Sequence, residues 1–205
     1  MTTSFDSLDT FYEQLAKRKN SLTVFNPYRE AHKLNNLKAY IEAMKALNPD
    51  VLLVGEALGF KGGRHTGIPF SSARLYQEVA HPFLVSLSSH LSVFEDDAEN
   101  TASIVWNALK AKQCVPVFWN AYPFHPHPSR IQKKNRAPNK IELTEGMFYL
   151  KAMNDFFKPS VIAGLGRKGV EAAKVAFPEK DILYIRHPSY GGKADFLKGI
   201  DAVLK

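Results

Sequence analysis

The sequence predicts an α/β fold in which helices cover both faces of a parallel sheet. Short apolar segments typical of buried strands recur along the chain, and segments with helical periodicity separate them. The strand candidates are residues 51–54, 114–119, 160–166 and 182–186. The sequence contains no internal repeat or linker, and 205 residues suffice for one core, so we expect a single domain over residues 1–205.

Helical patterns separate the strand candidates. They lie near residues 7–18, 34–47, 75–91 (interrupted near Pro82), 101–111, 141–157 and 167–177, and a last helix closes the chain. We expect the helices within residues 1–50 to pack on the core. The acidic segment "EDDAEN" is typical of a turn.

Composition excludes several classes of protein. Hydrophobic residues make up 45% and charged residues 23%, as in ordinary globular proteins. The single cysteine, Cys114, excludes a disulfide framework and any cysteine-ligated zinc or iron–sulfur site, and we expect it to be a small buried side chain. The sequence shows no signal-peptide order and no membrane-spanning run, so we expect a cytoplasmic protein without a membrane partner.

A positive charge favours a polyanionic partner. The formal net charge is +7, and residues 121–140 contain no Asp or Glu. That segment carries Arg130, Lys133, Lys134, Arg136 and Lys140. It is predicted to be a long loop, and such loops are usually functional, although a merely solvated basic loop fits the composition equally well.

Unusual residues follow three of the four strands. The segments are 55–72, which is rich in glycine, 120–140, and 187–193. Parallel strands point the same way, so these loops should meet at one edge of the sheet, where ligands bind in open α/β folds. Glycine in such loops permits tight turns and close approach to a ligand.

Two other kinds of site are weakly indicated. The glycines of 164–169 match a dinucleotide-binding fingerprint, but no suitable acid follows, and close packing of a helix on a strand explains them better. His125 and His127 are close in sequence, yet no second cluster of ligands accompanies them. We therefore expect no metal.

The three loops together suit a flipped base on a sugar–phosphate chain. Phe70 offers a stacking face, and the Asn120 amide offers a donor and an acceptor for a base edge. His187 can donate to a base carbonyl, Ser189 can bind phosphate, and the basic stretch 130–140 can follow the strand. Taken singly, these residues also fit a core aromatic, a turn former and a strand cap.

Several motifs in order resemble the uracil-DNA glycosylase superfamily. "GEALG" with the downstream "TGIPFSS" is similar to the first motif of its iron–sulfur branch, and "WNAYPFHPH" resembles the motif in which an Asn reads the base. "NRAPNKIEL", "SVIAGLG" and "HPSYGG" resemble the later segments, the last being the His-Pro-Ser motif of the DNA-intercalating loop. The matches cover most of residues 50–195.

The resemblance implies a three-layer α/β/α sandwich with a central four-stranded parallel sheet. It also implies a monofunctional DNA glycosylase that flips a base, hydrolyses the N-glycosidic bond and needs no cofactor. Asn120 and His187 would stabilise the departing base. The base-binding set implied by these motifs is Gly55, Ala57, Gly59, Phe70, Asn120 and His187.

The first motif departs from the best-known members. Ala57 stands where they carry a catalytic Asp, and Leu58 replaces a Pro. The acid is Glu56, as in the iron–sulfur branch, although the cysteines of that branch are absent. We expect Glu56 to orient water or stabilise the sugar cation; a loop-ordering hydrogen bond is the alternative. Imidazoles that could activate water instead are those of His65, His125 and His127.

Gly59 bears on the substrate. It stands where uracil-specific members place a Tyr that blocks the 5-substituent of the base, so we expect room for uracil or a bulky 5-substituted pyrimidine. The role would be base-excision repair or antiphage defence. A catalytically inactive DNA-binding module on the same fold is the alternative that Ala57 and Leu58 suggest.

The resemblance also implies the surface that meets DNA, single- or double-stranded. Tyr190 is expected to fill the emptied base stack. The expected DNA-binding residues are Ser189, Tyr190, Gly191, Arg130, Lys133, Lys134 and Arg136, on a protein that we expect to be monomeric.

Overall fold

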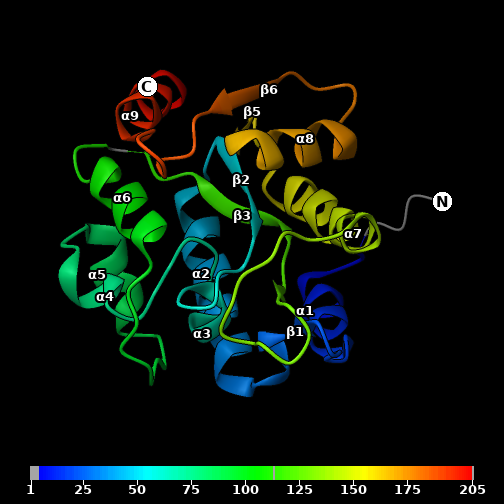
Figure 1. Cartoon of the computed structure of the whole chain (residues 1–205). Helices are drawn as coiled ribbons and strands as arrows, with labels where there is room; N and C mark the ends of the chain where they lie inside the picture. The colour runs from blue at the N-terminus through cyan, green and yellow to red at the C-terminus, as the bar shows by residue number, and fades with distance from the viewer. Residues whose placement is uncertain (1–4, 113, 205) are drawn as a thin grey trace.

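A four-stranded parallel sheet forms the centre of the computed structural model, which describes residues 5–112 and 114–204 (Figure 1). Its strands are β2 (Val51–Ala57), β3 (Val117–Tyr122), β5 (Val161–Leu165) and β6 (Ile182–Ile185), in the order β3-β2-β5-β6. The predicted fold class is confirmed. The order in which strands are added changes side at β2, because β3 lies on one side of β2 and β5 on the other.

Helices cover both faces of the sheet (Figure 1). One layer contains α7 (Lys140–Phe157), which packs on β3, and α8 (Gly166–Ala176), which packs on β5 and β2. The other layer contains α2 (Ala31–Leu47), α5 (Pro82–Ser88), α6 (Asn100–Leu109) and α9 (Lys193–Val203). None of the helices among the described residues is long and apolar enough to cross a membrane.

The strand boundaries differ from the predicted ones at the ends that matter for a site. β2 continues past Val54 to Ala57, because Gly55 and Ala57 pair with Asn120 and Tyr122 of β3. β3 begins at Val117 rather than at Cys114, since Pro116 has no backbone N–H to donate. Cys114 is exposed, so the prediction that it is a buried side chain was wrong.

The remaining elements are α1, which the sequence analysis predicts, and several very short ones, which periodicity does not all predict. They are α1 (Leu8–Lys17), β1 (Val24–Phe25), η1 (Pro27–Arg29), α3 (Gly63–Thr66), α4 (Leu75–Glu78) and β4 (His125–Pro126). β1 and β4 pair antiparallel, Val24 with Pro126 and Phe25 with His125. This pairing ties the N-terminal segment to the loop that follows β3.

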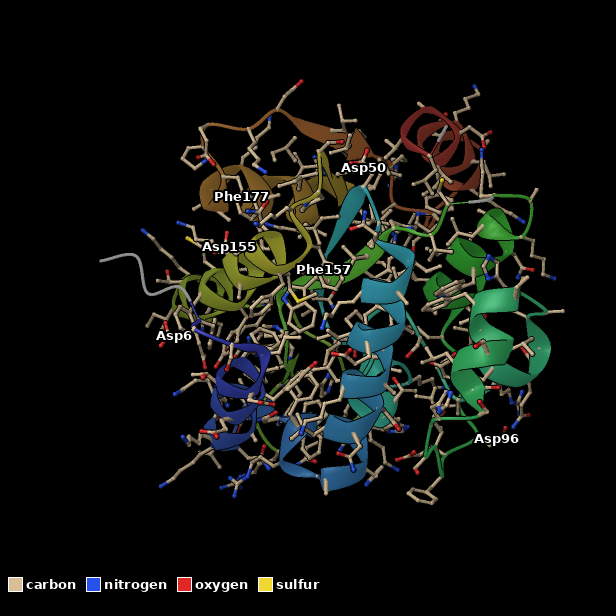
Figure 2. The ribbon with its side chains drawn as sticks, turned by 180° about the vertical axis from the view of Figure 1, so that it is seen from behind. Asp6, Asp50, Asp96, Asp155, Phe157 and Phe177 are labelled. Carbon is tan, nitrogen blue, oxygen red and sulfur yellow. The ribbon has the colours of Figure 1, made fainter. Side chains whose placement is uncertain are left out.

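Asp50, which precedes β2, links the start of that strand to the start of β5. Its carboxylate accepts hydrogen bonds from the Ser160 backbone N–H at 3.2 Å and the Ser160 hydroxyl at 2.6 Å, and its carbonyl accepts one from Val161 N–H at 3.1 Å. Asp50 is labelled in Figure 2. The two strands therefore start side by side.

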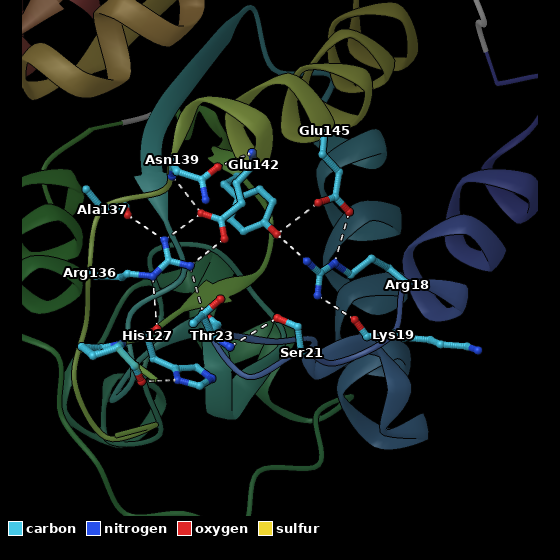
Figure 3. Close-up of polar contacts among 12 residues, drawn as sticks. Arg18, Lys19, Ser21, Thr23, His127, Arg136, Ala137, Asn139, Glu142 and Glu145 are labelled. Carbon is cyan, nitrogen blue, oxygen red and sulfur yellow. Dashed lines mark hydrogen bonds and ion pairs between the residues drawn. The ribbon is translucent and has the colours of Figure 1, made fainter. Parts of the chain in front are cut away.

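Arg136 holds the loop after β4 against the body of the protein (Figure 3). Its Nη1 and Nη2 donate to the two carboxylate oxygens of Glu142 at 2.7 and 2.6 Å. The guanidinium also donates to the carbonyls of His127, Ala137 and Thr23 at 3.1, 2.9 and 3.1 Å, which uses all five of its N–H donors. Glu142 in turn closes a capping box with Asn139 at the start of α7.

The charge state of Glu142 follows from these contacts. Burial alone would raise the pKa of this carboxyl, but the Arg136 guanidinium and the Asn139 backbone N–H bind the ionised form and lower its pKa below the ordinary value. The pair therefore remains ionised at neutral pH, and the loop stays attached to the first turn of α7.

Replacing Arg136 with Ala should lower the free energy of unfolding by about 2–3 kcal/mol, because the buried Glu142 carboxylate loses its charged partner. Urea unfolding at pH 7 measures the change. Lys134→Ala, which removes an exposed cation from the same loop, is the matched control and should stay within about 0.5 kcal/mol of the parent. Equal losses in the two variants would contradict the structural role of Arg136.

Candidate functional site

A cavity of about 810 Å³ opens at the carboxyl ends of the parallel strands. The three loops predicted to meet there do meet. The cavity is lined by Gly55, Glu56, Ala57, Leu58, Gly59, Gly63 and Phe70, by Asn120, Asn135 and Arg136, and by His187, Ser189 and Tyr190. It also lies at the topological switch beside β2, where ligands bind in open α/β sheets.

Asn120 is the buried polar group on the floor of this cavity. Its strand register places it beside Gly55, and only 4% of its surface is exposed. A Cβ at position 55 would collide with the Asn120 Oδ1 and would lie 2.6 Å from Cζ of Phe70. The Asn120 amide has no hydrogen-bond partner among the described residues, so it is available to a ligand.

Phe70 is held in an unusual backbone conformation at the cavity wall. Its φ is +53°, which bulky residues rarely adopt, and the Trp106 indole N–H donates to its carbonyl at 2.9 Å. Its ring packs against Phe118 at 5.0 Å between centroids and remains half-buried. Phe70 is therefore both packed on the core and open to the cavity.

Glu56 lies on the other face of β2. Because side chains alternate along a strand, it points away from the face of Gly55, and it also lines a smaller cavity of about 230 Å³ with residues of α7 and α8. Burial raises the pKa of Glu56; Lys168 opposes this and Glu171 adds to it. Its carboxyl accepts no hydrogen bond from the described residues, which argues against the loop-ordering alternative.

The His187 ring is fixed in one tautomer. Its Nδ1 accepts a hydrogen bond from the Ser189 backbone N–H at 3.2 Å, so the proton of the neutral ring lies on Nε2. Burial and then the neighbouring Arg186 charge lower the pKa of His187, which favours this neutral form. A Cβ on Gly166, at the end of β5, would lie 3.2 Å from the His187 Cβ, so the ring sits beside the start of α8.

Tyr190 projects from the rim of the cavity. Its side chain is 99% exposed, and both it and Gly191 have positive φ, +52° and +75°. Gly191 itself does not line the cavity. A fully exposed aromatic on so tight a turn contributes nothing to the core.

The basic residues that the sequence analysis assigned to DNA binding divide into two groups. Arg130, Lys133 and Lys134 are exposed on the loop, outside the cavity lining. Arg136 was expected to contact DNA, but every donor of its guanidinium is already bound within the protein, and its role is structural. The sequence analysis missed three cations that line the cavity, Arg167, Lys168 and Arg186, although they directly follow the third and fourth strands.

The three histidines considered for water activation lie outside the cavity. Both ring nitrogens of His125 are 2.9 Å from backbone carbonyls, those of Leu58 and Gln132, and the ring is fully buried. His65 contacts Asp97 and Arg64, and His127 contacts the Pro128 carbonyl. These imidazoles hold loops in place, so the geometry favours Glu56 over them as the group that orients water.

The sequence analysis expected open space beside Gly59, but the Glu99 carboxyl occupies it. A Cβ at position 59 would lie 2.8 Å from Oε1 of Glu99, and a Cβ at Gly62 would collide with Oε2 of the same carboxylate. Glu99 also lines the cavity. It lies in the segment interpreted as a simple turn, and no local pattern marks it.

The glycines of 164–169 have structural reasons. A Cβ at Gly164 would collide with the Val170 backbone, and one at Gly169 with the Val54 carbonyl. These contacts allow α8 to lie close against β5 and β2, which fits the packing explanation rather than a dinucleotide fingerprint.

Comparisons with known proteins agree with this architecture. The family model described as "Uracil DNA glycosylase superfamily" matches residues 42–203. The crystal structure of wild-type SMUG2 from Pedobacter heparinus superposes with a TM-score of 0.63 at 15% identity, over 95% of this chain and 97% of that chain, which shows a common fold. No curated protein sequence matches the chain.

Gly55→Ala should disturb Asn120 and Phe70 and lower the free energy of unfolding by about 1–3 kcal/mol, because the added Cβ overlaps both side chains. NMR of the Asn120 side-chain amide and urea unfolding report the two effects. Gly191→Ala is the control, since no atom lies within 4 Å of its Cβ and only its positive φ acts. An unmoved Asn120 signal in Gly55→Ala would contradict the packing described here.

Proposed function

Because the chain belongs to the uracil DNA glycosylase superfamily, we propose that it is a monofunctional DNA glycosylase. It hydrolyses the N-glycosidic bond of a flipped uracil or 5-substituted pyrimidine and leaves an abasic site. The observation that carries this proposal is that four groups meet in one cavity. They are the Asn120 amide and the Glu56 carboxyl, neither of which has a partner among the described residues, the His187 imidazole with its free Nε2, and the face of Phe70.

In this proposal the base binds on the side of β2 that Gly55 faces. The flipped base stacks on Phe70 and pairs its edge with the Asn120 amide, while the bare backbone at Gly55 lets the ring approach. Flipping costs a few kcal/mol of lost stacking and pairing, which these contacts offset.

Bond cleavage uses groups on both sides of the strand end. As the bond between C1′ and the base nitrogen breaks, its electron pair leaves with the base, and the Nε2–H of His187 donates to the carbonyl oxygen where negative charge collects. Glu56, as carboxylate, stabilises the sugar cation and orients water, whose oxygen bonds to C1′ and whose proton passes through Glu56 to solvent. The base anion then takes up a proton.

The rim of the cavity holds the DNA. Tyr190 enters the gap left by the flipped nucleotide. The turn of Ser189 and Gly191 approaches the nearest phosphates, together with the cavity cations Arg167 and Arg186. The exposed loop residues Arg130, Lys133 and Lys134 extend the contact along a single- or double-stranded substrate.

The setting we propose is the cytoplasm, where a monomer acts in base-excision repair or in defence against phages with modified bases. The inactive DNA-binding module stays the second candidate because Ala57 replaces the catalytic Asp of the best-known relatives. Salt-dependent DNA binding without release of any base would favour it.

Asn120→Ala should slow base release by about 10²–10³-fold, because it removes a preorganised donor at the developing charge. Mass spectrometry of bases released from DNA containing uracil or 5-substituted pyrimidines measures the rate. DNA affinity should fall far less, since phosphate contacts dominate it. Asn107→Ala, on the exposed side of α6, is the control. Equal losses of affinity and rate would contradict the role of Asn120, and no release by the parent protein from any substrate would overturn the proposed activity.

Neutralising Arg130, Lys133 and Lys134 to Gln should weaken DNA binding and flatten its salt dependence. Each lost phosphate contact should reduce the slope of log K against log salt by roughly 0.9 on duplex DNA or 0.7 on single strands. The control neutralises Lys45, Lys110 and Lys158, which are exposed and precede β2, β3 and β5 at the opposite edge of the sheet. An unchanged slope in the first variant would identify the loop as solvated surface.

A further inference from the structure

Glu99 is an acid that lines the cavity. It directly precedes α6, and its side chain does not cap that helix. Its carboxyl has neither a hydrogen bond nor an ion pair with any of the described residues, although Arg136, Arg167 and Arg186 line the same cavity.

The neighbouring acids behave differently. Glu95 lies 3.9 Å from the Lys33 ammonium, Asp96 lies 3.1 Å from the Arg74 guanidinium, and Asp97 lies 3.1 Å from the His65 ring. Each of these three carboxylates holds the segment to another part of the protein. Glu99 lacks such a contact, so anchoring of the segment does not explain it.

Two glycines of the loop after β2, Gly59 and Gly62, lie against the Glu99 carboxyl. A Cβ at Gly59 or Gly62 would overlap it, so two glycines leave the space that the Glu99 side chain occupies. The Gly62 and Arg64 N–H groups donate to the Gly59 carbonyl and the Phe60 N–H to Asn135, so these loop donors are used without Glu99.

We propose that Glu99 is a specificity-determining residue that accepts a hydrogen bond from a hydroxyl or amino group of the flipped base. This inference rests on the proposed glycosylase function and names the chemistry of the base. The donor is either the 4-amino group of a cytosine ring or the hydroxyl of a 5-hydroxymethyl group.

The energetics favour a base that brings such a donor. Burial raises the pKa of Glu99 to about 7, and no cation offsets that burial. A base with a hydroxyl or amino group supplies a hydrogen bond to the carboxylate, whereas a base with a methyl group or a carbonyl at that point supplies none. The resulting preference should be about 10- to 100-fold, the range for a hydrogen bond to a charged group.

Two substrate pairs that differ in one donor test the inference. They are 5-hydroxymethyluracil against thymine, and cytosine against uracil, each in the same oligonucleotide. Base release is measured in single turnover at pH 8.5, where the carboxylate form of Glu99 prevails. Equilibrium binding of the same oligonucleotides is measured in a Glu56→Gln background, which removes the proposed catalytic carboxylate.

The proteins compared are the parent, Glu99→Gln, Glu99→Ala and the control Asp96→Asn, which removes an exposed acid of the same segment outside the cavity. The parent and the control should prefer the donor-bearing base about 10- to 100-fold in one of the two pairs. The pair that shows this preference identifies the donor group. Glu99→Gln should reduce that preference about tenfold, and Glu99→Ala should abolish it. A thermal melt shows that the variants are folded.

The outcomes separate this inference from the proposed function. A parent without preference in either pair, or a preference that survives in both Glu99 variants, overturns the role of Glu99 while base release stands. A binding preference that is lost in Glu99→Gln, in a protein that releases no base, supports the role of Glu99 and overturns the glycosylase activity.

Discussion

The parallel register of β2 against β3 is the constraint on which the site depends. It places Gly55 beside Asn120, and the absence of a side chain at 55 leaves room for the Asn120 amide and the edge of Phe70. A shift by one residue would turn Asn120 to the opposite face of the sheet. The backbone pairing of two strands therefore decides where the buried Asn120 amide meets the cavity.

Contacts from outside the sheet then fix the loops around that amide. Asn135 accepts a hydrogen bond from Phe60 N–H, which joins the loops after β2 and β3, and Arg136 attaches the second of these loops to the first turn of α7. The indole of Trp106 holds Phe70 at its positive φ. These contacts hold the loops around the Asn120 amide in place before a ligand arrives.

The sequence predicted the sheet and the three loops because both depend on local patterns: apolar runs make strands, and polar or glycine-rich segments follow them. Glu99 could not be found that way, since only the packing of α6 brings it beside Gly59. The pairing of β1 with β4 is too short for periodicity to reveal. For Arg136, the Asn139 and Glu142 spacing does indicate a helix cap, but no local pattern shows that Glu142 also binds the guanidinium.

Strand alternation also divides the site into two parts. Gly55 and Glu56 are neighbours in sequence and must face opposite sides of β2. The wall that we propose binds the base therefore lies on the side of α6, and the Glu56 carboxyl lies on the side of α7 and α8. Under the proposed function, a change in the wall formed by Phe70 and Glu99 should therefore alter which base fits without moving Glu56. In the proposed glycosylase, substrate choice and bond cleavage can vary separately, because the groups that we assign to them lie on different sides of the same sheet.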